Sequence, residues 1–146
     1  MEFVEFAYGS PRYEKMLVLR DEMLRKPLGL EVYAEASEAE VDYRHFGIEN
    51  GDRMVACLMC VPLENDRVKI RQMAVLTQYQ GRGLGRRLME EVEALLKSDG
   101  VGRFMLHARH TAVGFYETLG YHVVGEVFEE VGIPHRQMEK TLPGHD

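Results

Sequence analysis

The chain has 146 residues, 45% hydrophobic and 29% charged, and a net charge of −6 at pH 7. This balance predicts one globular domain, residues 1–146, and argues against a disordered chain. The lack of a basic surplus argues against a nucleic-acid partner. The acidic balance is weakly compatible with a cationic or amine ligand. No apolar run approaches the ~20 residues that cross a bilayer, and the acidic N-terminus is unlike a signal peptide, so we expect a cytoplasmic protein without a membrane partner.

The first third of the chain predicts a strand and then a helix. The stretch EFVEFAY alternates apolar and polar residues, as a half-buried strand does. Ser10 followed by Pro11 is typical of a helix N-cap with proline at the first helical position, and the helix should run to about Arg25. The acidic segment from Glu31 to Asp42 fits either a loop or a short helix.

An antiparallel meander follows. The stretches YRHFGIEN and RMVACLMCVPL are joined by Asn50-Gly51-Asp52, and Asn-Gly favours the positive φ of a tight hairpin. The turn Glu64-Asn65-Asp66 leads into a third strand, RVKIRQMAVL.

The pattern then changes to alternating helices and strands. We expect a helix from about Gly83 to Ser98, a strand RFMLHA, a helix TAVGFYETLG, a strand HVVGEVFEE, a turn at Gly132-Ile133-Pro134 and a last strand HRQMEKTL. A strand-helix-strand unit requires a crossover and therefore one parallel pair. The fold class is thus α/β (α+β), with a mixed, mostly antiparallel twisted sheet flanked by helices.

Cys57 and Cys60 have the spacing of half a zinc site, but they fall within an apolar strand. Residues three apart on a strand point to opposite faces, so the pair cannot chelate one ion or easily close a disulfide. We expect two inert core thiols in a reducing compartment and no metal site.

The stretch QYQGRGLGRRL predicts an anion site at the start of a helix. Gly81, Gly83 and Gly85 leave no Cβ to block a phosphate from the free backbone N–H groups of the first helical turn. Arg82, Arg86 and Arg87 can add charge-assisted contacts. The sequence lacks the Gly-Lys-Ser/Thr of a Walker loop and the third glycine of a dinucleotide fingerprint. A purely structural turn remains the alternative.

Two motifs resemble the GNAT superfamily of N-acetyltransferases. Gln80-x-x-Gly83-x-Gly85 after RQMAVL is similar to its phosphate-binding turn, and Ala112-x-x-Phe115-Tyr116-Glu117-x-Leu119-Gly120-Tyr121 is similar to its late helix. Strand order, length and spacing agree along the whole chain. Where the superfamily often has an asparagine seven residues before the tyrosine, this chain has Arg109.

The resemblance implies that acetyl-coenzyme A binds as cosubstrate. Its pyrophosphate would lie on the backbone of the turn, and its pantetheine arm on a strand that splays from residues 104–108. The cofactor-binding residues expected on this basis are Met73, Ala74, Val75, Gln80, Gly81, Arg82, Gly83, Leu84, Gly85, Arg86, Arg109, Ala112 and Phe115.

Catalytic candidates follow from the needs of acetyl transfer to an amine. Tyr116 matches the family tyrosine that serves as general acid near the sulfur, and Phe115 is expected to pack on the sheet. A base must take a proton from the amine, and His107, Glu130 and His135 are the candidates. His45 could line the acceptor pocket, but we favour a structural place on its strand. Alternation should turn either Arg71 or Gln72 toward the pocket.

The leading interpretation is an acyl-CoA-dependent N-acetyltransferase that acts on a small-molecule or peptide amine by direct attack in a ternary complex. The alternatives are an acyl-CoA-binding sensor without turnover and a module that binds another phosphorylated ligand. Oligomeric state is left open, a homodimer included.

Overall fold

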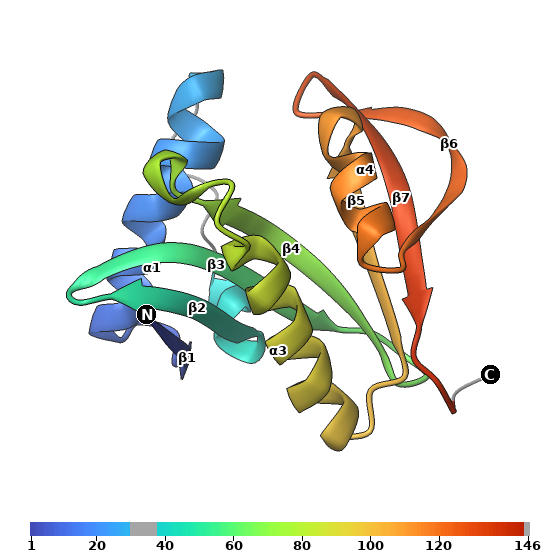
Figure 1. Ribbon diagram of the computed structural model, residues 1–146, viewed down its shortest axis with the longest axis horizontal. Coiled ribbons are helices and arrows are strands. Elements are labelled where there is room, and N and C mark those ends of the chain that lie inside the picture. Colours follow the sequence, from blue (N-terminus) through green and yellow to red (C-terminus); the bar gives the residue numbers. More distant parts are fainter. Residues whose placement is uncertain (30–37, 145–146) are drawn as a thin grey trace.

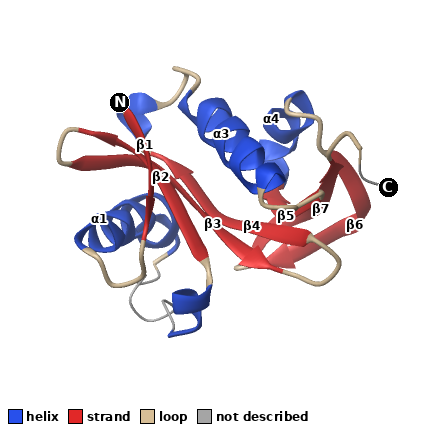
Figure 2. Ribbon diagram, turned by 90° about the horizontal axis from the view of Figure 1, so that it is seen from below, coloured by secondary structure: helices blue, strands red, loops and turns tan. Residues whose placement is uncertain are grey.

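A computed structural model describes residues 1–29 and 38–144. Seven strands form one sheet in the order β1-β2-β3-β4-β5-β7-β6, and every neighbouring pair is antiparallel except β4 and β5. Helix α1 covers one face of the sheet, and α3 with α4 covers the other (Figure 2). The predicted element order and the mixed, mostly antiparallel fold class are confirmed.

The N-terminal half contains β1 (Glu2–Phe6), α1 (Pro11–Arg20), β2 (Arg44–Asn50), β3 (Arg53–Pro62) and β4 (Arg67–Val75). Ser10 caps α1 as predicted, because its hydroxyl accepts a hydrogen bond from the Tyr13 N–H. The helix continues to Arg25 through a π-helical turn, Asp21–Arg25. Of the acidic segment, residues 38–42 form a short 3-10 helix, and residues 31–37 lie outside the described residues.

The C-terminal half contains α3 (Leu84–Ser98), β5 (Arg103–Arg109), α4 (Val113–Thr118), β6 (His122–Glu130) and β7 (Ile133–Thr141). Leu84, Leu88, Val92 and Leu96 of α3 are buried against the sheet, as the helical period predicts. The turn predicted at Gly132-Ile133-Pro134 is displaced: Val131 and Gly132 adopt positive φ and form it, while Ile133 already belongs to β7.

Within the sheet, the two halves are joined through the pairing of β4 with β5. Pairing begins at Arg67 with Arg103 and ends at Ile70 with Leu106, after which the strands diverge (Figure 1). A β-bulge begins there: two residues of β4, Gln72 and Met73, stand against one of β3, and Gln72 adopts φ +57°. A bulge bends its strand and increases its twist, which turns β4 away from β5.

Candidate active site

The glycine turn leads directly into α3. Gly81 and Gly83 have φ of +78° and +77°, a region that glycine enters without steric cost. A Cβ on either would meet no atom within 4 Å, so the backbone here is open on the side where a side chain would stand. The Arg87 N–H is bonded to the Gly83 carbonyl, so the N–H groups of residues 84–86 precede the first bond of the helical ladder. These features are compatible with a phosphate group, and the phosphate site stays a prediction.

The lack of a side chain at Gly85 matters for packing, and its expected place in the cofactor site stays a prediction. A Cβ at this position would lie 3.1 Å from the Phe115 ring and 3.3 Å from the Met73 methyl group. Its lack of a side chain therefore allows α3, α4 and β4 to approach closely. Phe115 packs here and is 37% exposed, so the expectation that it packs on the sheet is wrong.

The three arginines of the turn separate. The Arg82 guanidinium lies 5.1 Å above the Tyr79 ring, and Arg86 donates to the Thr118 carbonyl at 3.4 Å. Arg87 instead bonds Glu91 and the Met1 carbonyl, each at 3.0 Å. Arg87 is thus held next to the N-terminus of the chain. Of the three arginines, Arg82 and Arg86 remain beside the turn.

The divergence of β4 and β5 opens a cleft of about 530 Å³. Met73, Ala74 and Val75 line one wall and His107, Ala108 and Arg109 the other, with Ala112 nearby. Gln80 lines the end next to the glycine turn, and its side-chain amide donates to the Val75 carbonyl at 2.9 Å. Of the expected cofactor residues, Gly81 to Arg86 and Phe115 lie outside the lining of this cleft, and Leu84 is buried in the core.

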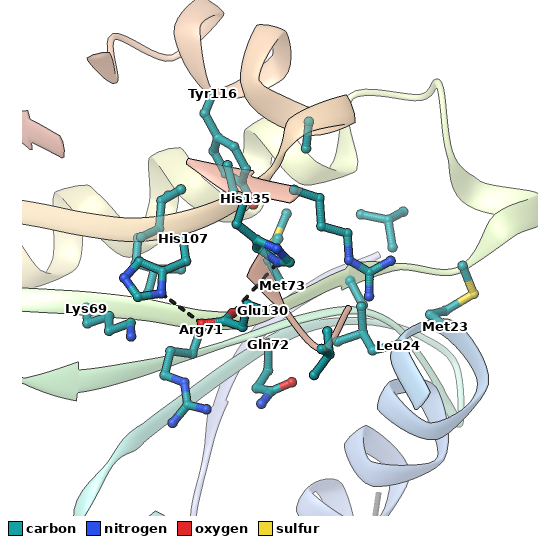
Figure 3. Close-up of a pocket in the computed structure, with 18 of the residues that line it drawn as sticks. Met23, Leu24, Lys69, Arg71, Gln72, Met73, His107, Tyr116, Glu130 and His135 are labelled. Atoms are coloured by element: carbon teal, nitrogen blue, oxygen red, sulfur yellow. Dashed lines mark hydrogen bonds and ion pairs between the residues drawn. The ribbon is translucent and has the colours of Figure 1, made fainter. Parts of the chain in front are cut away.

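Tyr116 extends from α4 into the cleft (Figure 3). Its side chain is buried, with edge-to-face contacts to Phe115 and Tyr121 at centroid distances of 5.0 and 6.0 Å. Burial raises the pKa of Tyr116 to about 12. The phenol therefore keeps its proton at neutral pH and can act as a donor.

The structure brings all three base candidates together in the same cleft. Glu130, at the end of β6, lies 3.0 Å from Nδ1 of His107 on β5 and 3.7 Å from Nε2 of His135 on β7 (Figure 3). The second nitrogen of His135, Nδ1, lies 2.7 Å from the Ile133 carbonyl and must donate its hydrogen there. The ring is thereby oriented with Nε2 toward Glu130.

Electrostatics keep Glu130 ionised. Partial burial alone would raise the pKa of its carboxyl, but the hydrogen bond from His107 and the electrostatic influence of the neighbouring His107, His135 and Lys69 hold it below its ordinary value. At neutral pH the group is therefore a carboxylate, able to attract an ammonium ion.

The bulge in β4 changes which side chains reach the cleft. Both Arg71 and Gln72 line it, so the prediction from simple alternation that only one would do so is wrong. Positive φ at a glutamine has no sequence signal comparable to a glycine. Lys69, two residues before Arg71, also lines the cleft and was missed, although the same alternation places it on that face.

The end of the first helix also contributes to the cleft. Met23, Leu24 and Arg25 line it, and Arg25 donates to the Gln72 side chain at 2.9 Å. The sequence contains no local signal for the bond between Arg25 and Gln72, because it joins positions 47 apart in the chain.

His45 and the two cysteines lie outside the cleft. Nε2 of the buried His45 lies 2.8 Å from the Glu40 carbonyl, which gives the histidine the structural place that we favoured. Cys57 and Cys60 are buried and free, and burial raises the pKa of each thiol to about 12, so both are inert as predicted. Within residues 1–29 and 38–144 there is no cluster of three or more side chains suited to a metal ion.

Comparisons with known proteins agree with this geometry. A family model described as an acetyltransferase (GNAT) domain matches residues 13–142. An acetyltransferase candidate of Bacillus subtilis is 33% identical over 68% of this chain and 74% of its own length. The B. subtilis protein YjcF, an uncharacterized N-acetyltransferase, is 29% identical over 92% of this chain and 96% of its own.

Solved structures share the fold. Escherichia coli ElaA superposes with a TM-score of 0.82 at 23% identity, covering 95% of this chain and 98% of its own. An aminoglycoside 6'-N-acetyltransferase in complex with coenzyme A has a TM-score of 0.80 at 21% identity and covers both chains fully. None of the helices in the described residues is long and apolar enough to span a membrane.

Proposed function

The chain belongs to the GNAT acetyltransferase family, and we propose that it transfers an acetyl group from acetyl-coenzyme A to a primary amine as one domain spanning residues 1–146. The observation that carries the proposal is the composition of the cleft between β4 and β5. It holds a protonated phenol, Tyr116, and an ionised carboxylate, Glu130, with two histidines beside it. The glycine turn stands next to the same cleft.

The residues that would hold the cosubstrate follow from the fit of the turn. The open backbone at Gly81 and Gly83 and the first N–H groups of α3 suit a diphosphate, with Arg82 and Arg86 beside them. Backbone groups of Met73 and Val75, on the diverging strand, suit an extended pantetheine arm. Acetyl-coenzyme A supplies an acetyl group activated as a thioester.

Deprotonation of the amine is assigned to the Glu130 cluster. The carboxylate attracts the acceptor as an ammonium ion, and His135 then accepts its proton at Nε2, the nitrogen that its bond to Ile133 leaves as the basic one. Glu130 lies beside the resulting imidazolium and stabilises it. His107 donates to the same carboxylate and fixes its position.

The neutral amine then attacks the acetyl carbonyl directly while both substrates are bound. Holding the reacting groups side by side in the cleft supplies a large share of the rate. The Tyr116 hydroxyl is the proton donor to the leaving sulfur, and its raised pKa keeps that proton in place at neutral pH.

Calorimetric titration with acetyl-coenzyme A, desulfo-coenzyme A and ATP tests the first half of the proposal. We expect micromolar binding of the first two and much weaker binding of ATP. A screen of primary amines with free-thiol detection tests the second half. Absence of coenzyme A binding would contradict the proposal, and tight binding without turnover of any amine would favour the sensor interpretation.

A further inference from the structure

The cleft carries a charge opposite to that of the whole chain. The chain has a net charge of −6, yet four of the charged side chains that line the cleft, histidines aside, are basic and one, Glu130, is acidic. The basic four are Arg25, Lys69, Arg71 and Arg109. A surplus of positive charge in a cleft selects a ligand with a negative group.

Two of these cations form a pair on the β4 side of the cleft. Lys69 and Arg71 are alternate residues of β4 and therefore share a face of the strand. In the part of the chain that the structure describes, neither lies within ion-pair distance of a carboxylate. Partial burial of Lys69 and the charge of Arg71 lower the pKa of the lysine, and the charge of Glu130 acts in the opposite direction. Lys69 is half-buried and Arg71 is exposed, and two like charges on one face of a strand together attract an anion.

Their position separates them from the groups that suit the cosubstrate. Lys69 and Ile70 are in the last paired stretch of β4 with β5, whereas Met73, Val75 and the glycine turn lie beyond the bulge. In Figure 3 Glu130 lies between Tyr116 and Arg71. A ligand with its amine at Glu130 would therefore extend toward Lys69 and Arg71, away from the turn that suits the diphosphate.

We infer that the acceptor of this enzyme is an amine that also carries an anionic group, a carboxylate or a phosphate, and that Lys69 and Arg71 bind this group while Glu130 receives the amine. The inference rests on the proposed function. The planar guanidinium of Arg71 can bind either anion through two hydrogen bonds, and the Lys69 ammonium adds a point charge. The two residues determine acceptor specificity and take no part in the proton transfers.

An anion titration tests the site without turnover. Arginine Nε–H signals of the protein bound to coenzyme A are followed by nuclear magnetic resonance while inorganic phosphate or acetate is added. We expect a saturable shift of the Arg71 signal, assigned by its loss in Arg71→Lys. The exposed Arg53 outside the cleft, assigned through Arg53→Lys, is the internal control and should not move in the same way. Equal, unsaturable shifts of both signals would overturn the inference.

Matched acceptors identify the anion and test specificity. The pairs are 4-aminobutyrate against butylamine and 2-aminoethyl phosphate against ethanolamine. The anionic member of at least one pair should have a kcat/KM at least about tenfold higher, and Lys69→Gln with Arg71→Gln should remove this preference through KM, with Arg53→Gln as the control. Equal or better use of butylamine and ethanolamine, which lack the anionic group, would overturn the inference and leave the proposed function standing. A saturable anion shift without any acetyl transfer would count against the proposed function alone.

Discussion

The hydroxyl of Tyr116 is the smallest feature on which the proposed chemistry depends. Tyr116→Phe removes only this oxygen from a buried ring and should lower kcat by about 100-fold, because general acids contribute factors of that order. The affinity for acetyl-coenzyme A should stay within about twofold of the wild type, as measured by calorimetry beside steady-state kinetics.

Tyr121→Phe is the matched control for that experiment. Its hydroxyl donates to Glu93 at 2.8 Å, and it is absent from the lining of the cleft. This variant should lose about 1 kcal/mol of stability and keep its kcat. An equal loss of kcat in both variants would assign Tyr116 to packing.

Gly83 tests the phosphate site at the same scale. Gly83→Asp places a carboxylate where an anion is proposed to bind, and the affinity for coenzyme A should fall by at least about 100-fold. Gly83→Asn is nearly the same shape without the charge, and asparagine tolerates positive φ. Calorimetric titration of both variants should show Asp at least about tenfold weaker than Asn. Equal affinities would show that bulk and not charge blocks the turn.

At the scale of elements, local signals were predictable and long-range ones were not. Asn50-Gly51, Ser10-Pro11 and the glycines before α3 each specify a turn or a cap through their own backbone preferences. The bulge at Gln72 has no such signal, because the residue adopts positive φ within the irregular pairing of β4 with β3. Because of this bulge, Arg71 and Gln72 both reach the cleft. The alternation of side chains along a regular strand therefore could not predict which residues line the cleft here.

Helix α1 is joined to residues 38–42 by a buried cluster around Glu40. The Arg20 guanidinium donates to both carboxylate oxygens, at 2.9 and 3.2 Å, and the Tyr13 hydroxyl donates at 2.7 Å. Glu40→Gln weakens these charge-assisted bonds and should lower the free energy of unfolding by about 3 kcal/mol at pH 7, as measured by urea denaturation. Glu38→Gln, on the same turn but exposed, should have an effect below about 0.5 kcal/mol.

The cluster around Glu40 also predicts how the stability difference between the wild type and Glu40→Gln depends on pH. Burial alone would raise the pKa of Glu40, but the bonds from Arg20 and Tyr13 hold it below its ordinary 4.5. A carboxyl whose pKa is lower in the folded state stabilises the protein fully above its unfolded pKa, and this stabilisation is lost as pH falls through the folded value. The difference in free energy of unfolding between the wild type and Glu40→Gln should therefore decrease below about pH 4.5. A gap that stays constant down to pH 3 would contradict this.

At the scale of the whole molecule, charge was a poor guide to the site. The acidic balance of the chain agreed weakly with a cationic ligand, whereas the cleft is lined mainly by basic side chains. Net charge sums over the surface, and the folded arrangement of a few strand residues decides the local field. The family and the fold class were predictable, because the motifs that carry them are continuous in sequence. The cluster of His107, Glu130 and His135 depends on three strands meeting.

The division of the sheet gives the last prediction. Only the four residue pairs from Arg67–Arg103 to Ile70–Leu106 join β4 to β5, so a ligand that contacts both sides of the divergence should stabilise the fold as a whole. At 100 times its dissociation constant coenzyme A should add about 2.7 kcal/mol and raise Tm by about 8 °C. Differential scanning calorimetry would measure this, with ATP and the Gly83→Asp variant as controls. A similar rise in Tm with ATP, or with coenzyme A in the variant, would mean that the stabilisation comes from general anion binding and not from a diphosphate site at the glycine turn.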